Sequence, residues 1–314
     1  MTEKKESTHK TEVKEAPQFA PLHDLIEGSW LLFQTTALSF LKLAAFTLGF
    51  FLLGTIILSI IFIGLAFVIG PSHINLYAMS PANYFLLAVA LIIGILYVIW
   101  ILLVVTVSSI ISIFILQGKD ASSITALIGQ SKPYILPYII TMVLSSVLIL
   151  GGIMLFFIPG LFIAVFFVFV LYEIVIEKQS GVAALSRSYI MVKNHFWDVV
   201  WRLFILEVTY LIISSLFNHL AGTDWLLRLV QFLFSVFWTW YFRAYVYTLY
   251  TEVRKRTIFP QKISITWIWV VSLVGWVIAI LLSFAIVSNF SHRNTLMHHM
   301  RHDHTYQVSR GKSV

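Results

Sequence analysis

The sequence predicts an all-α polytopic membrane protein with about seven transmembrane helices, and two observations lead to this class. The chain of 314 residues is 59% hydrophobic and 11% charged, whereas an average soluble domain carries about 25% charged residues. The apolar residues also gather in runs long enough to cross a bilayer, with short polar segments between them. A soluble core of this size needs far less apolar surface, because a soluble protein keeps polar groups towards water.

The charge and the cysteine content exclude several classes of function. A formal charge of +7 is compatible with nucleic-acid binding. The Lys and Arg residues lie between the apolar runs, however, which is the pattern of membrane topology. We therefore expect membrane lipids and no nucleic acid as partners. The absence of cysteine excludes a disulfide framework and thiol chemistry, and no motif in the chain indicates a cofactor.

The transmembrane spans follow from the length of each apolar run. About 20 helical residues cross a hydrocarbon core of about 30 Å. On this basis, the expected spans are residues 40–69, 84–116, 137–157, 161–176, 197–220, 225–250 and 265–290. Residues 1–20 form an expected disordered tail that stays on the chain, because they lack the apolar region of a signal peptide.

The third and fourth spans come from one uncharged run, residues 134–172, which is interrupted by Pro159-Gly160. As a single helix this run would be about 58 Å long, nearly twice the thickness of the hydrocarbon core. Proline lacks an N–H group and glycine tolerates the dihedral angles of a tight turn. We therefore predict a hairpin turn at Pro159 and Gly160.

The orientation follows from the distribution of Lys and Arg around the spans. The N-terminal tail and the second, fourth and sixth connections contain most of the basic residues, including Lys119, Lys178 and Arg254. Residues 71–83 and the Pro159 turn contain none. This pattern predicts a multi-pass protein of the cytoplasmic membrane with its N-terminus inside and, after seven spans, its C-terminus outside.

An internal repeat is predicted from amphipathic stretches that precede the spans. Leu185, Tyr189, Val192 and Phe196 recur at helical spacing, with Ser180 as the expected N-cap. Similar stripes precede the first and third spans, so we predict three units of an interfacial amphipathic helix followed by two spans. The predicted organisation is a tail (1–20), a six-span domain (21–251, with repeats 21–117, 118–176 and 177–251), a basic loop with a seventh span (252–290) and a polar His-rich tail (291–314).

One segment carries a family resemblance. A Pro-Gly pair precedes a span, then come Glu177, Gly181, an Ala-Leu-x-x-Ser helix from Ala184 to Ser188, and the aromatic pair Phe196-Trp197. This pattern resembles the membrane domain of glycerophosphoryl diester phosphodiesterases and the stand-alone proteins related to it. The resemblance covers residues 118–250 and implies a six-span membrane architecture. The phosphodiesterase part of that family is similar to a TIM barrel of about 250 residues, for which this chain has no segment.

The charged residues inside the apolar runs are the candidate site residues. Glu207 and Arg243 lie at similar expected depth on neighbouring antiparallel spans, so we predict a membrane-embedded ion pair, which is either a structural staple or part of a substrate path. Glu173 and Glu177 at helical spacing either bind a cation or cap the span at the interface. Arg187 and Lys193 are the predicted contacts to anionic lipid headgroups.

The C-terminal tail contains the candidate metal ligands. His298 and His302 are four residues apart, which suits a metal site outside the membrane, and the alternative is a disordered tail with solvated imidazoles.

Three functions remain open from the sequence. The first is a non-enzymatic scaffold or accessory factor with lipid contacts. The second is a transporter of a small or lipid-like solute that uses Glu207 and Arg243. The third is an intramembrane hydrolase, against which the absence of a recognisable nucleophile and base counts.

Overall fold

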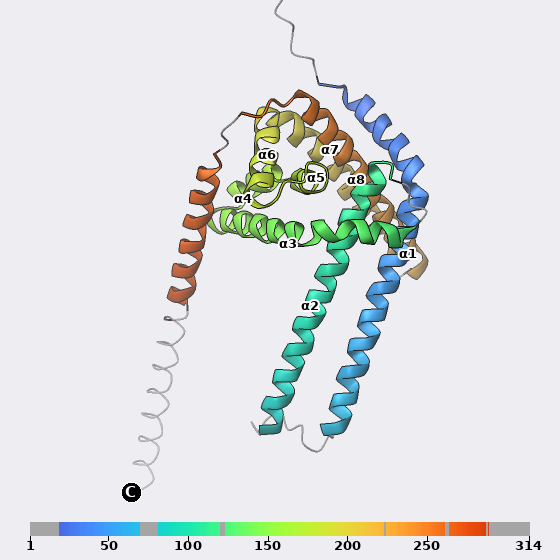
Figure 1. Ribbon diagram of the computed structural model, residues 1–314, viewed down its shortest axis with the longest axis vertical. Helices are drawn as coiled ribbons and strands as arrows, with labels where there is room; N and C mark the ends of the chain where they lie inside the picture. The colour runs from blue at the N-terminus through green and yellow to red at the C-terminus, as the bar shows by residue number, and fades with distance from the viewer. Residues whose placement is uncertain are drawn as a thin grey trace, which may run out of the picture. The chain divides into compact units, whose positions relative to one another are not determined.

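The computed structural model describes residues 19–69, 81–119, 123–222, 224–260, 264–286 and 288, and the regular elements within these residues are all helices. They are labelled in Figure 1 as α1 (Leu22–Ile69), α2 (Pro81–Leu116), α3 (Ile124–Leu155), α4 (Phe157–Phe166), α5 (Val170–Val175), α6 (Gly181–Asn194), α7 (Phe196–Ala221) and α8 (Trp225–Arg256). An unlabelled C-terminal helix, Thr266–Ile286, follows α8. The predicted all-α class is confirmed.

Six helical segments among the described residues are long and apolar enough to cross a membrane. They are Leu22–Gly64, Leu87–Leu116, Ile124–Leu155, Phe157–Val175, Phe196–Ala221 and Thr266–Ile286. The chain therefore belongs to the integral membrane proteins. Helix α8 is not among the six segments, and it carries Arg228, Gln231 and Arg243 together with several Trp and Tyr residues. The predicted span at residues 225–250, and with it the count of seven, stays a prediction.

The chain folds into two compact units, and each unit combines two separate stretches of sequence. In the described part of the chain, residues 19–40 and 197–258 form the first unit, and residues 41–196 and 259–288 form the second. The predicted organisation into consecutive segments does not include this pairing of distant stretches.

In the second unit, the chain folds back between α3 and α4, but not at the predicted residues. The turn lies at Phe156, whose backbone is extended with φ −159° and ψ 151°. Pro159 and Gly160 instead lie in the first turn of α4, where proline is tolerated because the first N–H groups of a helix have no intrahelical partner. Gly160 allows α4 to approach α3 closely, because a Cβ atom there would lie 2.6 Å from the backbone nitrogen of Ile153.

The fourth candidate span is interrupted. Helix α4 ends at Phe166 and α5 begins at Val170, so residues 167–169 leave the regular helix. Helix α6 packs against α3, α4 and α5, and eight of its fourteen residues are buried. The apolar stripe that predicted an interfacial helix is therefore covered by protein, and the position of α6 along the headgroups stays a prediction.

The three predicted repeats do not share one local structure. The first and second amphipathic stretches continue without a break into the spans that follow, as parts of α1 and α3. In contrast, α6 is separated from α7 by His195, which has φ −134° and ψ 32°. The repeat therefore stays a prediction from the sequence.

The C-terminal helix docks on α3 through small residues. Ser272 Oγ donates a hydrogen bond to the carbonyl of Leu148 at 2.7 Å, and Trp276 Nε1 donates to the carbonyl of Val147 at 3.1 Å. A Cβ atom on Gly275 would lie 1.8 Å from the carbonyl oxygen of Gly151. This backbone-to-backbone approach is typical of small residues at contacts between membrane helices.

In the first unit, aromatic side chains join α8 to the beginning of α1 and to α7. Phe237 and Tyr241 of α8 contact Trp30 and Phe33, with the Phe33 and Phe237 centroids 4.8 Å apart. Tyr210 of α7 stacks on Trp238 at 5.7 Å. These rings form a packed aromatic layer within the first unit.

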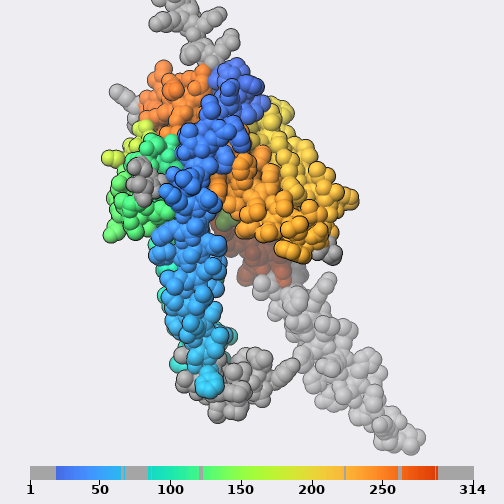
Figure 2. Space-filling view, turned by 90° about the vertical axis from the view of Figure 1, so that its right-hand side faces the viewer, coloured from blue at the N-terminus to red at the C-terminus, as the bar shows by residue number. Residues whose placement is uncertain are grey.

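Apolar side chains remain exposed along much of the second unit. On α1 after residue 40 they include Leu48, Leu53 and Ile56, each more than half exposed. Figure 2 shows that α1, coloured blue, is uncovered along this part of its length. Surface of this composition suits contact with lipid chains, because a water-soluble monomer rarely exposes apolar patches of this extent.

Candidate functional site

A cluster of one guanidinium and two carboxylates lies where α5 and α6 meet in the second unit. Arg187 Nε donates to Oε2 of Glu173 at 2.6 Å, and Arg187 Nη2 lies 3.6 Å from Oε2 of Glu177. The Glu173 side chain is 0% exposed, whereas those of Arg187 and Glu177 are 22% and 28% exposed. The cluster is therefore a buried charge-assisted hydrogen bond that extends to the surface through Glu177.

An aromatic ring completes the surroundings of Arg187. Its guanidinium carbon lies 4.3 Å from the centroid of Phe259, within the range of a cation–π contact. The charge of Arg187 is thus shared between a buried carboxylate, a half-exposed carboxylate and a ring. The predicted contact between Arg187 and lipid headgroups is corrected: this side chain is turned into the protein, because Glu173 needs a buried partner.

The two carboxylates are placed differently from either reading of the sequence. Glu173 and Glu177 hold an arginine from the next helix, and neither a cation nor an interfacial cap beside Lys178 is required to explain their spacing. The α5–α6 connection closes this contact. It turns at Lys178, with φ 55°, and the N–H of Gln179 donates to the carbonyl of Glu173 at 3.1 Å. Sequence reasoning named Arg187 but missed its pairing with the two carboxylates, because this turn determines which residues it meets.

Ser188, next to Arg187 on α6, bridges the interruption between α4 and α5. Its hydroxyl donates to the carbonyl of Phe166 at 2.8 Å and accepts from the N–H of Phe169 at 3.3 Å. The side chain is fully buried, at 0% exposure. In an apolar environment an unpaired backbone group is costly, so one hydroxyl supplies partners to both ends of the broken helix.

The start of α6 is fixed from a distant helix. Ser180 occupies the N-cap position, as predicted, but its side chain makes no capping hydrogen bond. Instead, the N–H of Gly181 donates to the hydroxyl of Thr141 on α3 at 2.7 Å. Gly181 has φ +56°, a region that favours glycine. In the signature segment, Glu177, Gly181 and Ser188 therefore each have a structural contact within the second unit.

The predicted ion pair between Glu207 and Arg243 is not formed in the described part of the chain. Glu207 is exposed on α7, and no ion pair joins it to Arg243, which is half-buried on α8. Phe204 and Leu211, which lie one turn from Glu207 on α7, are 53% and 61% exposed. Helical depth was predicted from residue counts alone, and counts do not determine which way each side chain faces.

The remaining predicted site residues are Lys193 and the two candidate metal ligands of the tail. Lys193 is exposed at the end of α6, with its ammonium 5.7 Å from the centroid of Tyr189, so its predicted headgroup contact stays open. His298 and His302 lie outside the described residues. Within the described ranges, no group of three or more His, Asp or Glu side chains is placed to hold a metal ion.

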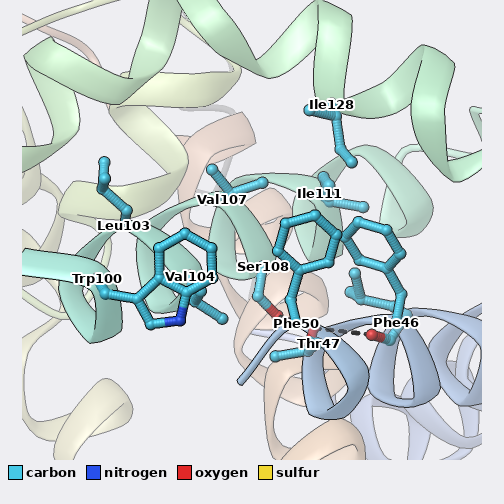
Figure 3. A pocket seen from close by; sticks show the side chains of 11 residues that line it. Phe46, Thr47, Phe50, Trp100, Leu103, Val104, Val107, Ser108, Ile111 and Ile128 are labelled. Atoms are coloured by element: carbon cyan, nitrogen blue, oxygen red, sulfur yellow. Dashed lines mark hydrogen bonds between the residues drawn. The ribbon is translucent and has the colours of Figure 1, made fainter. Parts of the chain in front are cut away.

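An apolar cavity of about 160 Å³ lies between α1, α2 and α3 in the second unit. Figure 3 shows it with the indole of Trp100 and the ring of Phe50 along its walls; these two rings stack at 5.9 Å. Thr47 and Ser108 contribute two hydroxyls, which lie 3.3 Å apart, and Trp100 contributes its buried indole N–H. The other lining residues are Leu43, Phe46, Leu103, Val104, Val107, Ile111 and Ile128. Sequence reasoning missed this cavity because apolar lining residues resemble any other span residues.

The comparisons with known proteins add no relative. No protein-family model matches the chain, and no curated protein or solved structure gives a significant match. The resemblance to the phosphodiesterase membrane domain accordingly stays a prediction that rests on the signature residues. What the structure shows on its own is an all-helical chain of the integral membrane class.

Proposed function

We propose that the protein is a non-enzymatic scaffold or accessory factor of the cytoplasmic membrane, with lipid contacts. One observation carries this proposal: the paired carboxylates of the second unit are bound by Arg187 from the next helix. A carboxylate pair that acts in general acid–base catalysis has to reach a substrate, whereas Glu173 is fully buried against a guanidinium. This arrangement suits a rigid polar core that holds α5 and α6 together.

The family resemblance supports the same role. Among the signature residues, Glu177 pairs with Arg187, Gly181 begins α6 with a hydrogen bond to Thr141, and Ser188 bonds the backbone between α4 and α5. A motif with these contacts specifies an architecture. We therefore infer a membrane domain of the phosphodiesterase-associated type that acts without the enzymatic part.

Extraction under mild conditions tests the proposal. We expect native mass spectrometry of the gently extracted full chain to show bound lipid, a partner protein, or both. Purified protein is assayed in parallel with glycerophosphodiester substrates. Phosphodiester hydrolysis above the level of an Arg187→Gln preparation would contradict the non-enzymatic role. Extraction of the protein with neither lipid nor partner bound would contradict the role as a scaffold with lipid contacts.

The proposed topology places the N-terminus and α6 inside, as the Lys and Arg distribution predicts. The chain contains no cysteine, so single cysteines report on accessibility without background. Phe157, which is 70% exposed, is the outer probe, and exposed Lys193 is the inner probe. A membrane-impermeant maleimide should label Phe157→Cys in intact cells and Lys193→Cys only after permeabilisation.

A transporter is the second candidate, and exposed Glu207 is the observation that favours it. A carboxylate among lipid-facing side chains costs at least about 2.5 kcal/mol unless it meets a partner or water. A water-filled path would make Glu207→Cys reactive to the impermeant maleimide, whereas Thr209→Cys, exposed two residues further along α7, serves as the comparison. If neither cysteine reacts in the membrane, there is no hydrated path at this helix.

A further inference from the structure

We propose that the α1–α2 cavity of the second unit and Lys42 together bind one anionic lipid. A section of one acyl chain occupies the cavity, and the phosphate of the headgroup meets the ammonium of Lys42. This inference rests on the proposed function, in which lipid contacts are general, and it assigns a particular site and a particular lipid class to that function.

Lys42 is an isolated charge. It is the single Asp, Glu, Lys or Arg residue between Glu27 and Lys119. Its side chain is exposed, and none of the ion pairs of the described residues includes it. A lone ammonium beside a long apolar run extends along the helix towards the headgroup layer, where anionic phosphate is the available counter-charge.

The cavity begins immediately after this residue. Its α1 wall is formed by residues 43–50, starting with Leu43, and the opposite wall by residues 100–111 of α2. At 1.5 Å per residue, the α1 wall is about 10 Å long, within the half-thickness of about 15 Å that one acyl chain spans in a bilayer. Lys42 is thus placed at one end of a chamber that is long enough for a section of an acyl chain.

The chemistry of the walls excludes most other ligands. Nine of the eleven lining residues are hydrocarbon or aromatic, and the hydroxyls of Thr47 and Ser108 already share a hydrogen bond at 3.3 Å. An apolar cavity of about 150 Å³ stays dry and accepts a hydrocarbon molecule of benzene size. The cavity therefore suits a section of hydrocarbon chain, with the charged group left outside it.

Lipid chains are expected next to the cavity, because the helices that form it expose apolar side chains. Leu48, Leu53 and Ile99, on the two helices that form the cavity, are 58%, 52% and 49% exposed. The same helices contain two of the six apolar segments of transmembrane length. A chain that moves into such a cavity from the bilayer gains much less than one that moves in from water, because it is already surrounded by hydrocarbon. Selectivity for one lipid therefore has to come from Lys42.

Trp100 closes the far end of the chamber. Its indole nitrogen would lie 2.0 Å from a Cβ atom placed on Gly54, so the ring rests directly on the α1 backbone. A second hollow of about 530 Å³, lined by Thr55, Tyr97 and neighbouring residues, lies beyond this ring along the same two helices. The indole thus limits how far a chain can extend from the Lys42 end.

Native mass spectrometry of the detergent-purified full chain tests the site. The probes are dioleoylphosphatidylglycerol, which is anionic, and dioleoylphosphatidylcholine, which is zwitterionic, each added in steps. The wild-type protein should retain one phosphatidylglycerol in preference to phosphatidylcholine. Lys42→Gln should lower the affinity for phosphatidylglycerol by about fivefold, which corresponds to one lost headgroup contact. Lys255→Gln, which removes an exposed lysine from α8, is the matched control and should leave the preference unchanged.

A second pair of variants separates the cavity from the charge. Val107→Phe places a ring in the chamber and should weaken retention of both lipids to a similar extent, by about threefold, because it removes space for the chain and leaves the Lys42 contact in place. Gly49→Leu adds a similar apolar side chain to α1 where a Cβ atom meets nothing within 4 Å, and it should not change binding. Val104→Phe replaces Val107→Phe if the latter does not yield monodisperse protein.

Three results would overturn the inference. They are equal effects of Lys42→Gln and Lys255→Gln, equal effects of Val107→Phe and Gly49→Leu, and a higher unfolding temperature of Val107→Phe with unchanged lipid retention. The last result would identify the cavity as an empty packing defect. If the protein retains lipid in all these variants, this site is refuted while the general lipid contacts of the proposed function survive.

Discussion

Arg187 Nε lies 2.6 Å from Oε2 of Glu173, and this contact fixes a fully buried carboxylate to a helix that begins eight residues later. The pair has an unequal environment, since Arg187 keeps 22% of its side chain exposed and Glu173 none. Loss of the arginine therefore removes the opposite charge from a fully buried carboxylate, whereas loss of Glu173 leaves an arginine that can still turn towards Glu177 and solvent.

Arg187→Gln should destabilise the protein by about 3 kcal/mol or more, in the range for breaking a buried pair from one side. Glu173→Gln should cost less, because the remaining guanidinium keeps Glu177 and the Phe259 ring as partners. Thermal unfolding in detergent measures both. The double variant Glu173→Gln/Arg187→Gln should be less destabilised than the sum of the single variants. Strict additivity would show that the two side chains do not depend on each other.

Ser188→Ala should lower stability by about 1–3 kcal/mol, because the carbonyl of Phe166 and the N–H of Phe169 lose this buried partner. Ser186→Ala is the matched control. Ser186 is also buried on α6, at 7% exposure, and its side chain makes no hydrogen bond to the described residues. Equal unfolding temperatures for the two variants would refute the bridging role of Ser188.

In the α3–α4 connection, replacement of Gly160 should destabilise the protein more than replacement of Pro159. Gly160→Ala should destabilise by about 1–3 kcal/mol, because its Cβ atom would lie 2.6 Å from the nitrogen and 2.9 Å from the Cα of Ile153. Pro159→Ala should cost less than about 1 kcal/mol, since alanine fits the first turn of a helix and only the restriction of the unfolded chain is lost. The unfolding temperatures of the two variants measure this difference. A larger decrease for Pro159→Ala than for Gly160→Ala would support a turn at the proline.

The membrane class and the positions of most spans could be predicted because apolar length is a local property of the sequence. The turn at Phe156 could not, since an extended phenylalanine has no signal comparable to that of Pro159-Gly160. Likewise, an apolar stripe on a helix looks the same whether it faces lipid or protein, so the burial of α6 became visible only with α3, α4 and α5 around it. The partners of Arg187 depend on the same packing.

Lys42, in contrast, could be noticed in the sequence, because it is an isolated charge in a long apolar stretch. A single charge between Glu27 and Lys119 can be read directly from the chain. Its meaning required the structure, because only the cavity that starts at Leu43 gives the charge a neighbour. By comparison, Glu207 and Arg243 had a clear sequence signal but occupy sites that do not join them in an ion pair.

The docking of the C-terminal helix should depend on the absence of a side chain at Gly275. A methyl group there would lie 1.8 Å from the carbonyl oxygen of Gly151, so Gly275→Ala must push the helix away from α3. The hydrogen bonds from Ser272 and Trp276 to α3 carbonyls would lengthen with it. Ser272 is 2% exposed, so a cysteine there reports on the contact in a chain without other thiols.

Maleimide labelling in detergent measures this change. Ser272→Cys alone should react slowly, and its rate should rise at least about tenfold when Gly275→Ala is added, because an opening that costs about 1.4 kcal/mol less is ten times more populated. Gly94→Ala is the control, since a Cβ atom on Gly94 meets nothing within 4 Å. Ser283→Cys, exposed on the same helix, should react quickly in every background. An unchanged rate at residue 272 with Gly275→Ala would mean that the helix does not rely on the Gly151–Gly275 approach, and its position would then have to come from Trp267, which donates to the hydroxyl of Tyr189 at 3.0 Å.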